Sequence, residues 1–186
     1  MSQSHIMLVR HGDASAGWSV HPDPGLSESG REQAAETGKL LIEEISSYQL
    51  VSSPKKRAIE TMEVMIEKKE CSFHLDSRFI EIPSNNIHAD KKRDWLVNIF
   101  TTPIKELPEA VKEWRNDLIS WLEDIEDNFI VTTHFMVINA LISYLTSNNK
   151  ISYFHPDYAS RTEIFIKNGE MTKLVLGDDK KTEINL

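Results

Sequence analysis

Five side chains that could do chemistry stand where short apolar runs end or helical patterns begin: Arg10, His11, Arg57, Glu81 and His134. In open α/β sheets, ligands bind at the carboxyl ends of the strands. Residues at these positions can therefore converge on one site even though they lie far apart in the chain. Two guanidinium groups, two imidazoles and one carboxyl form a set that suits the transfer of a phosphoryl group.

The physical demands of phosphoryl transfer explain why these residue types fit it. A phosphoryl group in transit spreads negative charge over its equatorial oxygens, so catalysis is mostly positioning and electrostatic stabilisation. Arginine stays charged and offers a planar fork of donors that matches two phosphate oxygens. A neutral imidazole can attack phosphorus and carry it covalently, and neighbouring arginines favour the neutral form. A carboxyl beside bound phosphate is pushed toward protonation and can then protonate the leaving oxygen.

Six segments match the motifs of a known family in the family's order, and they are Leu8–Gly12, Leu26–Ala34, Ser52–Thr61, Arg78–Ile82, Val131–His134 and Ala159–Ile164. On these segments the chain resembles the histidine phosphatase superfamily, the phosphoglycerate-mutase-like enzymes of its larger branch. The resemblance implies that His11 is the nucleophile that becomes phosphorylated and that Glu81 is the proton donor. It also implies that the phosphoryl group is held by Arg10, Arg57 and His134.

Two further residues are predicted to contact the substrate, Ser15 and Phe135. Ser15 lies in the segment 12–24, which is long for a connection between a strand and a helix and therefore indicates a functional loop. This loop lacks the phosphate-binding asparagine that the family often has there. Phe135 stands where a glycine commonly follows the second histidine, so its ring could narrow the pocket. A glycine usual in the family shortly after the proton donor is also replaced, by the segment 83–86.

Strand and helix patterns alternate along the chain. Strands are expected at about 6–9, 49–52, 73–75 and 128–133, with a closing hairpin of 161–166 and 173–176 around Asn168 and Gly169. Helices are expected to follow Ser27 and Ser53, which are plausible N-caps, and to cover 110–125 and 136–145. This alternation predicts an α/β fold, a three-layer αβα sandwich around a mostly parallel sheet. The family resemblance adds one antiparallel strand at the edge.

The chain is expected to form a single domain over residues 1–186, with a helical insertion at approximately 83–127. In the resembled family such insertions tend to cover the active site and set specificity. The basic run Lys91, Lys92 and Arg93 lies within the 83–103 segment of this insertion. We expect this segment and Phe135 to choose the substrate, because the phosphate-holding residues recognise only the phosphoryl group.

Composition excludes several classes of protein. The formal net charge of −8 argues against nucleic acid as a partner. The single cysteine, Cys71, cannot form an internal disulfide. The leading apolar run is too short for a secretory signal, and no run approaches the length of a membrane span. A cytoplasmic enzyme without a membrane partner is therefore expected.

The sequence leaves three functions open. The first is a metal-independent phosphatase that needs no cofactor and hydrolyses a phosphomonoester, either a small phosphorylated metabolite or a phosphoprotein, through a phosphohistidine on His11. The second is a phosphoryl transfer of the phosphoglycerate-mutase type, although the chain is shorter than such mutases. The third is a weakly active regulatory or phosphoprotein-binding member of the same fold. The intact set of five residues counts against loss of activity, whereas Phe135 and the missing asparagine favour a binding role.

Overall fold

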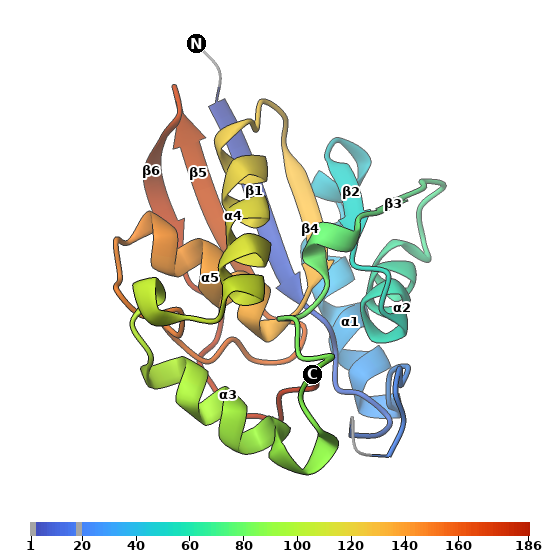
Figure 1. The fold of residues 1–186 in the computed structure, drawn as a ribbon. Coiled ribbons are helices and arrows are strands. Elements are labelled where there is room, and N and C mark those ends of the chain that lie inside the picture. Colours follow the sequence, from blue (N-terminus) through green and yellow to red (C-terminus); the bar gives the residue numbers. More distant parts are fainter. Residues whose placement is uncertain (1–2, 18–19) are drawn as a thin grey trace.

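A six-stranded sheet forms the middle layer of the computed structural model, which describes residues 3–17 and 20–186 (Figure 1). The strand order across the sheet is β3-β2-β4-β1-β5-β6. The strands are β1 (Gln3–Arg10), β2 (Gln49–Ser52), β3 (His74–Leu75), β4 (Phe129–Thr133), β5 (Arg161–Lys167) and β6 (Glu170–Val175). The carboxyl ends of β1, β2 and β4 therefore lie side by side at one edge of the sheet.

The direction of the strands is mostly parallel, as predicted. β1 pairs in parallel with β4, β4 with β2, and β2 with β3, whereas β5 is antiparallel to both β1 and β6. The antiparallel strand does not lie at the edge, where it was expected. The predicted hairpin places β6 outside β5, and its two connecting residues, Asn168 and Gly169, have φ angles of 54° and 80°. Positive φ at both positions gives the two-residue turn whose twist matches that of paired strands.

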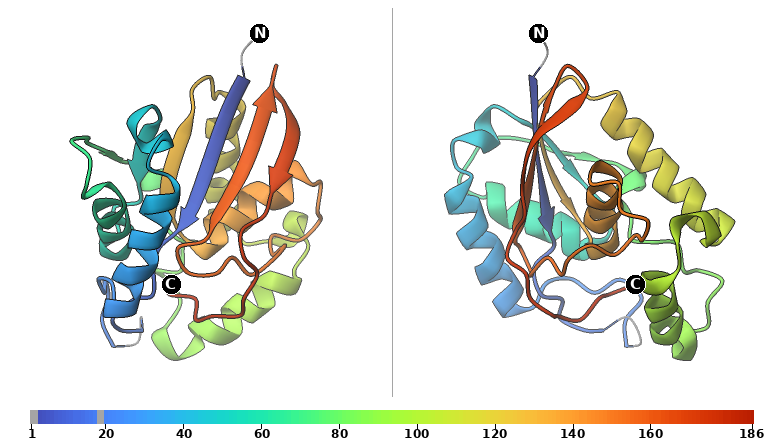
Figure 2. Two further views of the ribbon diagram at one scale, coloured as in Figure 1. Left: turned by 180° about the vertical axis from the view of Figure 1, so that it is seen from behind. Right: turned by 90° about the vertical axis from the view of Figure 1, so that its left-hand side faces the viewer.

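Helices cover both faces of the sheet (Figure 2). On one face α1 (Glu28–Leu40) and α2 (Lys56–Ile66) lie over a buried cluster that includes Met7 and Val9. On the other face α4 (Glu109–Glu123) and α5 (Phe135–Leu145) pack over a larger cluster that includes Ile6 and Leu8. Successive side chains of β1 thus alternate between two buried faces, which explains why the strand is apolar without interruption from Ile6 to Val9.

The helix starts were predicted correctly in one case and displaced in the other. Ser27 caps α1 as expected, because its side chain accepts a hydrogen bond from the backbone N–H of Gly30. Ser53 was expected to cap the next helix, but α2 begins at Lys56 and its N-cap is Lys55. The hydroxyl of Ser53 instead contacts His134 at 2.7 Å. The Ser53 side chain, which the local pattern assigned to a helix cap, thus contacts a residue that is distant in sequence.

The segment between Glu81 and β4 contains two α-helices. One belongs to a helical layer of the sandwich and the other lies outside the layers. The segment comprises the short 3-10 turns η3 (Ala89–Lys91) and η4 (Ile104–Glu106), together with α3 (Lys92–Thr101) and α4. α4 packs against the sheet as a layer helix, whereas α3 lies beyond the carboxyl ends of the parallel strands (Figure 1). The 3-10 turns η1 (Glu44–Ser46) and η2 (Ser77–Phe79) complete the elements. None of the helices in the described residues is long and apolar enough to cross a membrane.

The chain beyond β6 returns to the same edge of the sheet. Residues 176–186 run past the carboxyl end of β1 toward α3 (Figure 2). Ile184 and Leu186 pack against the larger core cluster, and Asn185 is buried. The edge at which the predicted catalytic residues gather is therefore bounded by α3 on one side and by the C-terminal segment on another.

Candidate active site

The structure brings the five predicted residues together and buries all of them: Arg10, His11, Arg57, Glu81 and His134. Arg10 ends β1 and His11 follows it, while His134 follows β4 in the same way. The parallel pairing of Arg10 with Thr133 sets the two strand ends level with each other. As a result, the rings of His11 and His134 lie with centroids 5.3 Å apart.

The protonation of His11 follows from its two hydrogen bonds. Its Nδ1 lies 2.7 Å from the carbonyl oxygen of Gly12, and a carbonyl can only accept, so Nδ1 carries the hydrogen. Nε2 is then the unprotonated nitrogen, and its lone pair accepts a hydrogen bond from Nε of Arg57 at 3.2 Å. Burial, reinforced by the charges of Arg57 and Arg10, holds the pKa of His11 well below its ordinary value. His11 is therefore neutral, with Nε2 available as a nucleophile.

The two arginines are buried cations with many nearby acceptors and aromatic rings. Arg57 is the second residue of α2, and its Nη1 lies 3.9 Å from a carboxylate oxygen of Asp23. The guanidinium carbon of Arg10 lies 4.2 Å from the centroid of the Tyr158 ring and 5.4 Å from that of Phe135. Stacking of this kind partly compensates a cation for the water that it loses on burial.

Other donors of both arginines contact the C-terminal segment. Nη1 of Arg10 donates to the Thr182 hydroxyl and its Nη2 donates to the carbonyl of Glu183. Nη2 of Arg57 donates to the carbonyl of Asn185 at 2.9 Å. The two carbonyl contacts could not be predicted from residue types, because every residue has a backbone carbonyl.

His134 is held by a residue that the sequence analysis did not assign to the site. Its Nε2 lies 2.7 Å from the Ser53 hydroxyl, and its buried Nδ1 has no partner among the described residues. Burial, with the charge of Arg57 next in importance, places the pKa of His134 well below its ordinary value. Ser53 precedes Arg57 within one of the matched segments, and this position was the available signal for its role.

Glu81 is not part of α5, but its carboxylate lies beside the first turn of that helix and accepts backbone hydrogen bonds. Its Oε1 is 3.0 Å from the amide nitrogens of both Ile82 and Met136. Burial raises the pKa of Glu81 to about 7, although these hydrogen bonds and the charges of Arg57 and Arg10 act in the opposite direction. The carboxyl can therefore either donate or accept a proton near neutral pH.

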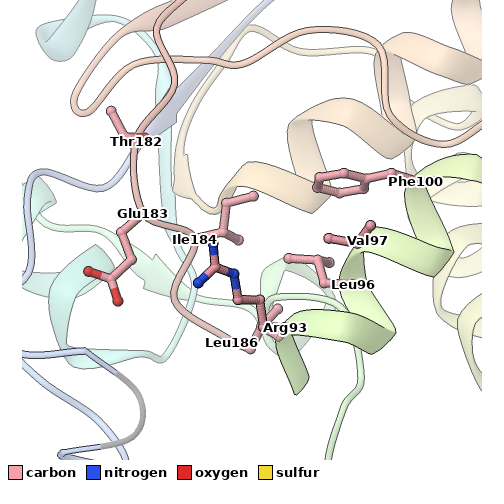
Figure 3. Close-up of a pocket in the computed structure, with 8 residues that line it drawn as sticks. All are labelled: Arg93, Leu96, Val97, Phe100, Thr182, Glu183, Ile184 and Leu186. Carbon is pink, nitrogen blue, oxygen red and sulfur yellow. The ribbon is translucent and has the colours of Figure 1, made fainter. Parts of the chain in front are cut away.

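A cavity of about 480 Å³ has Glu81 in its wall. Lys55, Lys92 and Trp114 also line it. The three consecutive basic residues of the insertion line different cavities. Only Lys92 borders the Glu81 cavity, whereas Lys91 lines a hollow on another side of α3 and Arg93 faces the C-terminal segment (Figure 3).

The two predicted substrate contacts outside the cluster have different surroundings. Ser15 is exposed, and its backbone N–H donates a hydrogen bond to the carbonyl of Gly25 at 2.9 Å. Phe135 is 1% exposed and stacks on Phe100 with ring centroids 6.0 Å apart. Its ring lies between the core and the guanidinium of Arg10, so it supports that arginine, and a direct contact with substrate stays a prediction.

Together these features define a class of site. At the carboxyl ends of the parallel strands the site combines a neutral imidazole, two arginines, a second imidazole and a protonatable carboxyl. This combination suits the handling of phosphoryl groups. The chain belongs to the histidine phosphatase superfamily (branch 1), whose family model matches residues 6–179. Comparison with curated protein sequences gave no match.

Several solved structures share the fold. YhfR of Bacillus stearothermophilus is 20% identical with a TM-score of 0.74, and the alignment covers 96% of this chain and 98% of that one. A phosphoglycerate mutase from Bacillus anthracis is 19% identical with a TM-score of 0.73, covering 94% and 93%. A mutant phosphoserine phosphatase from Entamoeba histolytica, in complex with phosphoserine, is 18% identical with a TM-score of 0.67, covering 92% and 96%. The chain is thus a member of a superfamily of phosphoryl-handling enzymes.

The hydrogen bonds of His11 generate a prediction that requires no substrate. In a long-range ¹H–¹⁵N NMR spectrum, His11 should show the neutral form with the hydrogen on Nδ1 at pH 6, because burial and two cations oppose protonation. Replacing Arg57 by Met should raise the pKa of His11, whereas Arg31→Met, on the exposed side of α1, should leave it unchanged. A doubly protonated His11 at pH 6 in the unmodified protein would contradict this assignment.

Proposed function

We propose that this protein hydrolyses phosphomonoesters through a phosphohistidine formed on Nε2 of His11, without a metal ion. The observation that carries the proposal is the pair of hydrogen bonds at His11. The carbonyl of Gly12 fixes the hydrogen on Nδ1, and Arg57 donates to the lone pair of the unprotonated Nε2. An arginine beside the attacking nitrogen is placed to bind an oxygen of the phosphoryl group that arrives there.

The first half of the reaction transfers the phosphoryl group from the substrate to His11. The phosphoryl oxygens take donors of Arg10 and Arg57, and the Nε2 lone pair of His11 attacks phosphorus as the P–O ester bond breaks. The departing oxygen needs a proton if the leaving group is an ordinary alcohol, and the protonated carboxyl of Glu81 supplies it. His134, which is neutral, contributes to binding the phosphoryl oxygens without adding charge.

The second half restores the starting state. A water molecule attacks phosphorus, the P–N bond breaks, and the carboxylate of Glu81 takes the proton that the water loses. Inorganic phosphate leaves, and His11 is neutral again. A pKa of Glu81 near 7 suits a group that must first give and then take a proton.

A second anionic group on the substrate would fit the cavity beside Glu81. The leaving group must lie near Glu81, and Lys55 and Lys92 line the same cavity. Together the two lysine side chains favour a leaving group that carries a carboxylate or another phosphate. The proposed substrates are therefore small phosphorylated metabolites or phosphoprotein segments with an additional negative charge.

The function can be tested by trapping the intermediate. Rapid quenching after mixing with a ³²P-labelled phosphoester should give label on His11 that survives alkali and is lost in acid. Label should be absent from the variant His11→Ala, and a chelator should leave the rate unchanged. Transfer of the label to a second metabolite in place of water would identify a mutase. A full loss of rate with the chelator, or no label at all with every ester tested, would contradict the proposal.

Glu81 should matter in proportion to the difficulty of the leaving group. Glu81→Gln should slow the hydrolysis of alkyl phosphates by about 100-fold or more, because general acid catalysis is typically worth this much. Nitrophenyl phosphate, whose leaving group needs little protonation, should lose far less rate. With alkyl phosphates, kcat/KM of the unmodified protein should fall as pH rises above about 7, since only the protonated carboxyl donates.

The same experiment can reject this role. Equal losses with alkyl and nitrophenyl phosphate would mean that Glu81 only positions other groups. The falling limb of the pH profile should disappear in the Gln variant, and its persistence would assign that limb to a different residue.

Lys91 and Lys92 line different cavities, so their replacements form a matched pair of variants. Lys92→Met should lower kcat/KM by about 5-fold for a phosphoester that carries a carboxylate, as expected for a partly exposed charge interaction of about 1 kcal/mol. Phenyl phosphate, which lacks a second anionic group, should change less than about twofold. Lys91→Met should leave both substrates unaffected, because Lys91 borders a different hollow. Equal effects of the two variants would place the specificity elsewhere.

A further inference from the structure

Three terminal nitrogens of the active-site arginines donate hydrogen bonds to the C-terminal residues 182–186, here called the strap. The Thr182 hydroxyl and the carbonyl of Glu183 accept hydrogen bonds from Arg10. The carbonyl of Asn185 accepts one from Arg57. Both arginines that are expected to hold the phosphoryl group are thus bound to neutral oxygen atoms of the protein itself.

Additional contacts hold the strap in this position. The Tyr158 hydroxyl donates to the carbonyl of Glu183 at 3.0 Å, and Asn185 is 3% exposed. Ile184 and Leu186 pack against the larger core cluster, to which Leu96 of α3 belongs. Figure 3 shows the strap facing α3 across a cavity of about 500 Å³, with these apolar side chains in its lining. Polar contacts to the arginines and apolar contacts to α3 therefore act together.

A donor hydrogen of a guanidinium that already points at a carbonyl is not available to a phosphate oxygen. The phosphate oxygens are charged and the strap oxygens are not, so the arginines bind the phosphoryl group more strongly once it is in place. A phosphate that uses these same donors must nevertheless break the strap contacts first. The association constant observed for phosphate is then the intrinsic constant multiplied by the fraction of molecules in which the strap is open.

We propose that residues 182–186 are an autoinhibitory strap, which occupies the phosphate donors of Arg10 and Arg57 and must be displaced before a phosphoryl group can bind. This inference rests on the proposed function in one respect, namely that the ligand of the two arginines is a phosphoryl group. It adds that the resting site is closed by the protein's own chain. Ligands that compete with the strap for these donors open the site.

The direct test compares phosphate binding with and without the strap. Inorganic phosphate and orthovanadate are titrated by calorimetry into the full chain and into a variant that lacks residues 182–186. The shortened variant should bind both anions at least about tenfold more tightly, because the cost of opening is gone. Arg57→Ala in the shortened variant should abolish this gain. Unchanged or weaker binding by the shortened variant, or no binding by either form, overturns the proposal.

A second variant keeps the full length of the chain. Ile184→Ser combined with Leu186→Ser removes the apolar anchors of the strap and should also tighten phosphate binding, by a smaller factor than deletion. Leu176→Ser is the control, since Leu176 is a 41% exposed apolar residue that precedes the strap. Equal phosphate affinity of the anchor variant and this control would count against the strap.

Hydrogen exchange tests the unmodified protein. Saturation with orthovanadate should speed the exchange of amide hydrogens in residues 182–186, because the displaced strap loses its contacts. Slower or unchanged exchange would overturn the proposal, since it would mean that the strap closes over the anion or is unaffected by it. Failure of the proposed function alone would look different: label on His11 would be absent while the difference in phosphate affinity persisted.

Discussion

The burial of two guanidinium groups beside His11 is the constraint on which the rest of the site depends. A buried cation is costly unless acceptors, rings or counter-charges surround it. Arg10 meets this demand with the ring of Tyr158, the carbonyl of Pro156 and oxygens of the C-terminal segment. Arg57 does so with the carbonyl of Asn185 and a distant carboxylate of Asp23. These partners come from three parts of the chain, namely Asp23, the stretch of Pro156 and Tyr158, and the C-terminal segment, so the cluster ties these parts together at this edge of the sheet.

The same two cations set the protonation of their neighbours. Together with burial they keep His11 and His134 neutral, and they oppose the effect of burial on Glu81, whose pKa settles at about 7. In the proposed mechanism, the nucleophile therefore needs no deprotonation, and the carboxyl of Glu81 can exchange a proton near neutral pH. When a phosphoryl dianion binds, it neutralises the arginines and raises the pKa of Glu81 further, so the proton donor is prepared by the substrate itself.

The sequence predicted what strand geometry dictates and missed what distant backbone contacts decide. Residues that follow parallel strands meet at one edge, so the convergence of His11 with His134 could be predicted from their positions alone. The prediction that Ser53 caps a helix was wrong, because its hydroxyl forms a hydrogen bond with His134. Lys91 and Lys92 are adjacent in sequence but border different cavities, since the turn of a helix separates neighbouring side chains. The contacts of the C-terminal segment could not be predicted, because carbonyl oxygens are common to every residue.

The central claim is that the arginines converge on Nε2 of His11 to receive a phosphoryl group. A crystal structure with orthovanadate tests it most directly, since vanadate can adopt the five-coordinate geometry of the transition state. The account predicts vanadium bonded to Nε2 of His11, its equatorial oxygens on Arg10 and Arg57, and residues 182–186 moved off both guanidinium groups. Vanadate bound away from His11, or bound while the carbonyls of Glu183 and Asn185 still accept from the arginines, would contradict it.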